Sequence, residues 1–221
     1  MDTSFIPFWN KLTPDQQQLL LSYSMERQVE AGEVLHGNGL ECVGFLLVLE
    51  GRLRAYMLSE EGKELTLYRL LSRDMCLFSS ACALRGADFD VSVVAETRSR
   101  VLQVPPKVYR QLMDQSMAVA SYTNELMAQR FSDVMWLMDQ ILNKRMDSRL
   151  AALLLEEADL LDTDTLKLTH EMLAGHLGSV REVVTRMLKY FQGEGLVRLS
   201  RGSVEILDRD RLTQMAEGSI R

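Results

Sequence analysis

The chain of 221 residues is 47% hydrophobic and 25% charged, which is the balance of an ordinary globular protein. It has no apolar run near the roughly 20 residues that cross a bilayer. Its start lacks the basic and apolar regions of a secretory signal, so we expect a cytoplasmic protein that makes no membrane contact. The net charge of -6 does not by itself indicate a nucleic-acid-binding protein.

Residues that serve catalysis or metal binding are sparse. The three cysteines, Cys42, Cys76 and Cys82, form no CxxC pair and match no zinc pattern. An odd number of cysteines argues against a disulfide framework, so we expect free and mostly buried thiols. No Ser/His/Asp set and no paired carboxylates stand out, and only His36 lies in the N-terminal half. The sequence therefore predicts no catalytic residues, no metal site and no enzyme activity.

A short helix and a run of strands are expected in the first 104 residues. Thr13 and Pro14 are typical of an N-cap and a first helical position. From residue 25 to residue 104, apolar runs such as GFLLVLEG, RLRAYML, LTLYRLL, FDVSVVAE and SRVLQVP alternate with turns. Strands at this spacing predict an all-β sandwich or barrel. Its turns are expected to contain Gly32, Gly51 and Gly62.

A helical pattern follows Pro105 and Pro106 and runs to about residue 142, with a break near Ser116. The second part has an apolar stripe with a spacing of seven residues. This helix either packs on its own sheet or packs against its twin in a dimer, and its length and wide stripe favour the dimer. The expected dimer residues are Met127, Arg130, Val134, Leu137 and Ile141.

Another helix, SRLAALLLEEADLL, is expected after a polar hinge at residues 143–147. Asp147 or Ser148 can cap its start, and its leucines form an apolar side. The acidic segment DLLDTDT that follows is expected to be a solvated turn.

The stretch LTHEMLAGHLGSVREVVTRMLKYF has the pattern of a helix-turn-helix. Thr169 is a natural N-cap for the first helix, and Gly178 gives the turn the backbone freedom that it needs. The second helix should point Val183, Val184, Met187 and Leu188 inwards. Its outer face then carries Arg181, Glu182, Thr185 and Arg186 near its start, where a recognition helix contacts base edges.

Two of these residue types suit base recognition. Arginine can bind guanine through two hydrogen bonds, and glutamate can accept one from cytosine. An exposed ion pair between Glu182 and Arg186, four residues apart, is the alternative. The two interpretations are compatible, because such a pair can orient the arginine.

A wing is predicted after Gly195, where LVRLS and SVEIL flank a turn at Arg201 and Gly202. Arg198 or Arg201 can reach a phosphate, which positions the protein without reading sequence. Between Lys167 and Gly202, six basic residues outnumber three acidic ones. The positive charge therefore gathers where the helix-turn-helix falls, and double-stranded DNA is the expected partner.

The block LAGHLGSVREVVTRMLKYFQGEGLV resembles the CRP/FNR family of bacterial transcription regulators, and the resemblance covers nearly the whole chain. The R-E-x-x-x-R pattern of that family falls on Arg181, Glu182 and Arg186. The family usually has Ser or Thr before the first arginine. Here it is Val180, which puts one backbone contact in doubt.

The resemblance implies an α+β fold in three parts. Residues 1–115 would form an N-terminal helix and a β-roll sensor, a cupin-like double-stranded β-helix. Residues 116–143 would form the dimerisation helix and hinge, and residues 144–221 a winged helix-turn-helix. A homodimer on a palindromic site with G·C pairs in each half-site is implied, with RNA polymerase as a further partner. The expected DNA contacts are Thr169, His170, Val180, Arg181, Glu182, Thr185, Arg186, Lys189 and Arg201.

The sensor departs from the cyclic AMP pattern of the family. Leu77–Ser79 stand where a Gly-Glu pair would hold the ribose, and Phe89–Asp90 stand where an Arg-Ser pair would hold the cyclic phosphate. An aspartate repels a phosphate, so cyclic AMP is disfavoured as the effector. An iron–sulfur cluster is also disfavoured, because no cysteine precedes Cys42.

An apolar wall that bears thiols remains as the expected effector site. Its residues are Met75, Cys76, Leu77, Phe78, Ser79, Ser80, Cys82 and Phe89. The open alternatives are a haem with His36 or a cysteine as axial ligand, a small apolar or aromatic effector, and a thiol switch at Cys76 or Cys82. A β-roll that binds nothing and serves as a scaffold for the dimer is the remaining one.

Overall fold

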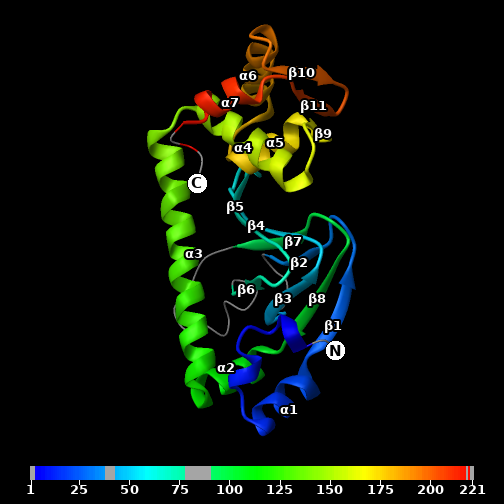
Figure 1. Ribbon diagram of the computed structural model, residues 1–221, viewed down its shortest axis with the longest axis vertical. Coiled ribbons are helices and arrows are strands. Elements are labelled where there is room, and N and C mark those ends of the chain that lie inside the picture. Colours follow the sequence, from blue (N-terminus) through cyan, green and yellow to red (C-terminus); the bar gives the residue numbers. More distant parts are fainter. Residues whose placement is uncertain (1–2, 38–42, 78–90, 218, 220–221) are drawn as a thin grey trace. The chain divides into compact units, whose positions relative to one another are not determined.

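The fold comes from a computed structural model, which describes residues 3–37, 43–77, 91–217 and 219. The chain forms two compact units (Figure 1). The first unit comprises residues 1–58 and 67–134, and the second comprises residues 59–66 and 135–221.

The first unit begins with two short helical turns, η1 (Thr3–Phe5) and η2 (Trp9–Lys11), and the helix α1 (Pro14–Tyr23). The predicted cap of α1 is confirmed. The Thr13 side chain accepts a hydrogen bond from the Gln16 backbone N–H, and the Gln16 side chain accepts one from the Thr13 backbone N–H. This reciprocal arrangement is a capping box.

Two four-stranded sheets follow, and they confirm the predicted sandwich. The first has the order β1-β8-β3-β6 and the second the order β2-β7-β4-β5. The strands of the first sheet are β1 (Met25–Val29), β8 (Ser99–Val104), β3 (Phe45–Glu50) and β6 (Met75–Cys76). Those of the second are β2 (Val34–His36), β7 (Ser92–Ala95), β4 (Leu53–Leu58) and β5 (Glu64–Leu70).

Strand β3 is buried on both of its faces. Leu46 and Val48 belong to the core between the two sheets, whereas Phe45, Leu47 and Leu49 belong to a second core. That second core also contains residues of α1, of α2 (Pro106–Gln115) and of the first part of α3 (Met117–Asn143). A strand buried on both faces needs a continuous apolar run rather than alternation, which is why β3 reads FLLVLE.

The break predicted near Ser116 is confirmed, because α2 ends at Gln115 and α3 starts at Met117. Within the first unit, α3 buries one line of residues at spacings of three and four. These are Val119, Thr123, Leu126, Arg130 and Asp133. The line contains a charged pair, so this face of α3 is not purely apolar.

The second unit consists of helices around a small sheet with the order β10-β11-β9. Its elements are α4 (Met146–Leu161), β9 (Thr165–Leu166), α5 (His170–Leu177), α6 (Arg181–Gly193), β10 (Val197–Ser200), β11 (Ser203–Ile206) and α7 (Arg209–Met215). They share one core that includes Leu154, Leu173, Leu188, Val204 and Leu212.

One local prediction for the second unit, the cap of α4, was wrong. Helix α4 begins at Met146 with Arg145 in the N-cap position and no side-chain cap, so Asp147 lies inside the first turn. A carboxylate there still interacts favourably with the helix dipole. The three aspartates of the acidic segment at residues 159–165 are exposed around a turn, as expected. The segment begins in the last turn of α4 and ends in the first residue of β9.

None of the helices in the described part of the chain combines the length and the apolar character needed to cross a membrane.

Candidate nucleic-acid interface

The predicted helix-turn-helix is formed by α5 and α6 (Figure 1). The Thr169 hydroxyl accepts a hydrogen bond from the Met172 backbone N–H at 3.2 Å, which caps α5. Gly178 ends α5 in the left-handed region, with φ of 64°, where a side chain would be strained. Helix α6 starts after Val180, which makes no side-chain cap bond, as expected for an apolar residue at that position.

The inner faces of the two helices pack in the shared core. Leu173 and Leu177 of α5 are buried, as are Val184, Leu188 and Phe191 of α6. Val183 and Met187, which were also predicted to point inwards, are half-buried. Because the apolar face of α6 packs in this core, the rotation of the helix about its axis is set, and its opposite face is directed away from the core.

Arg149 of α4 holds the end of α5 in place. Its Nη2 donates a hydrogen bond to the Leu177 backbone carbonyl at 2.7 Å. The last carbonyls of a helix have no partner within the helix, so this bond satisfies one of them. Burial lowers the pKa of the Arg149 guanidinium. Sequence reasoning missed this residue because 28 positions separate it from Leu177.

The outer face of α6 carries Arg181, Glu182, Arg186 and Lys189, all of them exposed. Within the described part of the chain, these four side chains form no hydrogen bond or ion pair, and the alternative Glu182–Arg186 pair is therefore not formed. Their polar groups are available to a ligand without first breaking an internal bond. Figure 1 shows α6 beside the β10–β11 hairpin in the second unit.

A hydrogen bond joins α5 to α6 close to this face. His170, the first residue of α5, has its Nδ1 2.8 Å from the Thr185 Oγ1 of α6. Both side chains are half-buried. Burial lowers the pKa of His170, and the positive charges of Arg181 and Lys189 lower it further. The predicted DNA-contacting residues His170 and Thr185 are thus brought together, although sequence reasoning did not foresee their bond.

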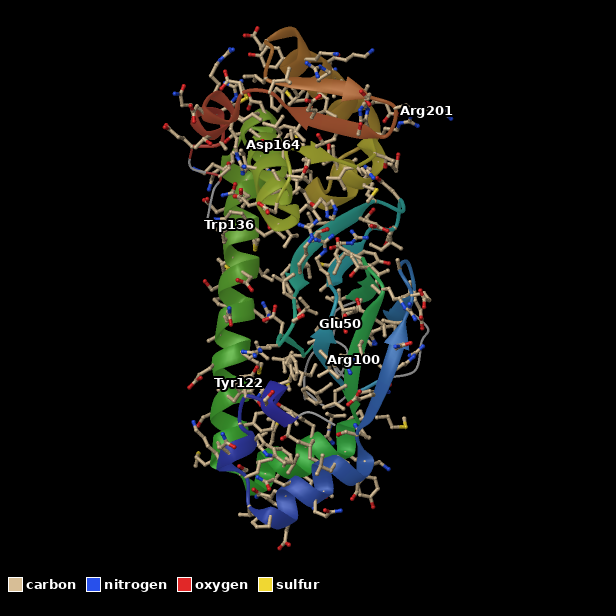
Figure 2. The ribbon with its side chains drawn as sticks, turned by 45° about the vertical axis from the view of Figure 1, so that its right-hand side comes forward. Glu50, Arg100, Tyr122, Trp136, Asp164 and Arg201 are labelled. Carbon is tan, nitrogen blue, oxygen red and sulfur yellow. The ribbon has the colours of Figure 1, made fainter. Side chains whose placement is uncertain are left out.

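The wing is confirmed as β10 and β11, paired antiparallel around a turn at Arg201 and Gly202. Arg198 and Glu205 face each other across the hairpin with an Nη1–Oε2 distance of 2.9 Å. Arg201 is exposed at the turn, as labelled in Figure 2, and makes no hydrogen bond or ion pair with the residues described. Of Arg198 and Arg201, Arg201 is therefore the one whose guanidinium is available to a phosphate without breaking an ion pair described here.

Part of the expected effector wall lies in the first unit. Met75, Cys76 and Leu77 are buried there, whereas Phe78, Ser79, Ser80, Cys82 and Phe89 lie outside the described residues. Cys42 and Asp90 lie outside them too. In the residues that the structure does describe, no three His, Cys, Asp or Glu side chains gather closely enough to hold a metal ion.

A buried polar cluster lies beside Cys76. The Arg130 guanidinium of α3 stands 4.3 Å from the centre of the Tyr68 ring, and its Nη1 is 2.9 Å from Asp133 Oδ2. Burial raises the pKa of Tyr68 well above its usual value, and the Cys76 thiol raises it further. Arg130 therefore packs within its own unit, and not with the exposed apolar side chains of α3.

Two family models match this chain. Residues 26–116 match the cyclic nucleotide-binding domain, and residues 148–215 match the Crp-like helix-turn-helix domain. A crystal structure from Eubacterium rectale, assigned to the CRP/FNR family of transcriptional regulators, is 48% identical and has a TM-score of 0.94. The match covers 97% of this chain and 99% of that one.

The chain belongs to the CRP/FNR family. The transcriptional regulator SdrP of Thermus thermophilus is 31% identical over 176 residues, which cover 77% of this chain and 82% of SdrP. The cyclic AMP receptor protein of the same organism is 27% identical over 212 residues, 96% of this chain and 97% of that protein. The predicted α+β fold, with an N-terminal β-sheet domain, a long helix and a C-terminal helix-turn-helix, is confirmed. The CRP/FNR protein described here is a transcription regulator with a DNA-binding domain, not an enzyme.

Proposed function

We propose that this protein is a cytoplasmic homodimer that binds a palindromic DNA site through α6, under the control of an effector in the β-roll. Residues 1–115 would sense the effector, residues 116–143 would dimerise and residues 144–221 would bind DNA. The observation that carries the proposal is the uncommitted set of Arg181, Glu182, Arg186 and Lys189 on the exposed face of α6. As a regulator of transcription, the DNA-bound dimer would act on RNA polymerase.

Selection from a pool of random duplexes tests the DNA-binding role. The full chain is expected to enrich a palindrome whose half-sites lie about 10 base pairs apart, one turn of DNA, with G·C pairs in each half-site for Arg181 and Arg186. Affinity for the enriched site should fall steeply with salt, because phosphate contacts release counterions. A matching single-stranded pool is the control. Failure to enrich any duplex sequence would refute the proposal.

The proposed dimer rests on a second face of α3. Met127, Phe131, Val134, Met138 and Ile141 repeat at alternating spacings of four and three residues, which is the seam of a coiled coil. Met127, Phe131, Met138 and Ile141 are exposed. A second copy of this chain is the partner whose own seam matches such a stripe. Arg130 and Leu137, also predicted for the dimer, lie to one side of this seam.

Replacing Phe131 with glutamate is expected to convert the dimer into a monomer. Phe131 is 69% exposed in the isolated chain, and a charge buried in an apolar seam is costly. Light scattering during gel filtration would measure the mass. Ser132→Glu places the same charge one position away, on an exposed residue outside the seam, and should leave the dimer intact. If the Phe131→Glu variant remained a dimer, the dimer interface would have to lie elsewhere on the chain.

For the sensor, we propose a small effector other than cyclic AMP in the β-roll, because Phe89–Asp90 stand where an Arg-Ser pair would hold the cyclic phosphate. A thiol switch at Cys76 is disfavoured, since the residue is completely buried and redox-active thiols are accessible ones. Thermal unfolding with a panel of metabolites identifies the ligand class, because a ligand of the folded state raises the melting temperature. The absorption spectrum of the purified protein tests for haem.

A further inference from the structure

The His170–Thr185 bond lies where it can affect base recognition. Thr185 is four residues from both Arg181 and Lys189 on α6, so the three share one side of the helix. It also directly precedes Arg186. His170 begins α5, and the first helix of a helix-turn-helix crosses the phosphate backbone. With α6 in the major groove as proposed, the 2.8 Å contact between Nδ1 and Oγ1 would couple a ring near the phosphate backbone to a hydroxyl near the groove.

The direction of this bond decides what Thr185 can offer to DNA. A neutral imidazole carries a proton on one nitrogen and accepts at the other. If Nδ1 is bare, the Thr185 hydroxyl donates to it and keeps only lone pairs for other partners. If Nδ1 carries the proton, Thr185 accepts from it, and the hydroxyl proton is free for a base.

Two features of the site select the first arrangement on DNA. A phosphate next to His170 accepts a hydrogen bond from Nε2 only when Nε2 carries the proton, and Nδ1 is then bare in the neutral ring. The surroundings of the ring within the protein also favour its neutral form, because burial lowers the pKa of His170, as do the charges of Arg181 and Lys189 on α6. Glu171, its neighbour on α5, is exposed.

We propose that His170 makes Thr185 a pure hydrogen-bond acceptor in the major groove, and that Thr185 thereby selects a base that offers an amino group. Cytosine N4 and adenine N6 are the donors in that groove, whereas guanine and thymine present acceptors. His170 is thus a positioning residue for specificity. The inference rests on the proposed function, because it requires α6 to enter the groove.

Protonation should reverse this preference. In the charged ring both nitrogens carry protons, so Nδ1 donates to Thr185 Oγ1 and the Thr185 hydroxyl proton becomes available to guanine or thymine. Burial, Arg181 and Lys189 lower the pKa of His170 in the DNA-free protein, whereas a DNA phosphate at Nε2 would raise it. The reversal is therefore expected as the pH falls from about 8 to about 5.5, across the range in which histidines titrate. A contact that was merely structural would not change base preference with pH.

Selection from random duplexes by the full chain at about pH 8 and about pH 5.5, on either side of a histidine pKa, tests the inference. At the higher pH, one position in each half-site should favour cytosine or adenine over guanine or thymine on the strand that Thr185 contacts. The preference should be about two- to tenfold, the value of one hydrogen bond. Thr185→Ser should keep this preference. His170→Phe should lose both the preference and its pH response. The lost phosphate contact should add a further loss of affinity that is the same for every sequence.

Tyr190→Phe removes an exposed hydroxyl from the same helix and should behave as the parent protein. If His170→Phe does not fold, Thr185→Val, which keeps the side-chain shape, must abolish the preference at that base pair alone. An unchanged preference and pH response in His170→Phe or in Thr185→Val would overturn the inference. Failure of the parent protein itself to select any sequence would instead overturn the proposed function.

Discussion

Replacing Arg186 with alanine is expected to weaken binding to the palindromic site by about 1–3 kcal/mol for each half-site. A symmetric dimer loses the contact twice, so the total effect reaches roughly 2–6 kcal/mol if the half-sites act independently. Arg186 is exposed on α6 and bonds to none of the described side chains. The lost energy is therefore that of binding, and the free energy of unfolding should change by less than about 0.5 kcal/mol.

Arg145→Ala is the matched control for Arg186→Ala. Arg145 lies in the same unit, its side chain is 86% exposed, and its Nη2 is 2.7 Å from Asp147. Titration of labelled duplex at fixed salt measures both variants. Arg186→Ala should also relax the preference at one base pair, because a base contact is lost. Equal weakening on all sequences would identify Arg186 as a phosphate contact instead.

Replacing Glu96 with glutamine is expected to lower the free energy of unfolding of the first unit by about 3 kcal/mol. The Glu96 carboxylate lies at the end of β7, with Oε2 2.6 Å from Arg52 Nε and 3.0 Å from Arg69 Nε. Arg54 Nε is 3.9 Å from the other oxygen. All four side chains are at most 16% exposed. Removing the charge of a carboxylate that faces three poorly solvated guanidinium groups is costly, because water compensates a buried charge poorly.

Urea unfolding of Glu96→Gln measures this loss. The chain has two tryptophans, and Trp9 packs against a core of the first unit. In a Trp136→Phe background, the fluorescence of Trp9 reports that unit. Glu50→Gln is the control, because Glu50 pairs with Arg100 at 3.8 Å but is 76% exposed (Figure 2). Its effect should be at most about 1 kcal/mol. Similar losses in the two variants would show that the Glu96 cluster is effectively solvated.

Prediction from sequence worked best where neighbours in the chain are neighbours in space. Thr13, Thr169 and Gly178 act within one helical turn, and their roles are confirmed. The long apolar runs of β3, β4 and β8 are also confirmed as strands. Strand β1, MERQV, has four exposed residues out of five, because it lies at the edge of its sheet. It therefore lacks the apolar signal. Strands β6 and β9 have two residues each, which is too short to show a periodic pattern.

The amino-acid sequence by itself determined which stretch forms the helix-turn-helix and which charged residues lie on its outer face, because helical periodicity and turn chemistry are local. Only the tertiary structure decided that Arg149 holds the end of α5, that Arg130 and Asp133 pack beside Tyr68, and that His170 binds Thr185. These pairs join residues whose proximity comes from packing of separate elements. The periodicity of each element indicates which of its sides is buried. It does not indicate which polar atom of another element a given side chain will contact.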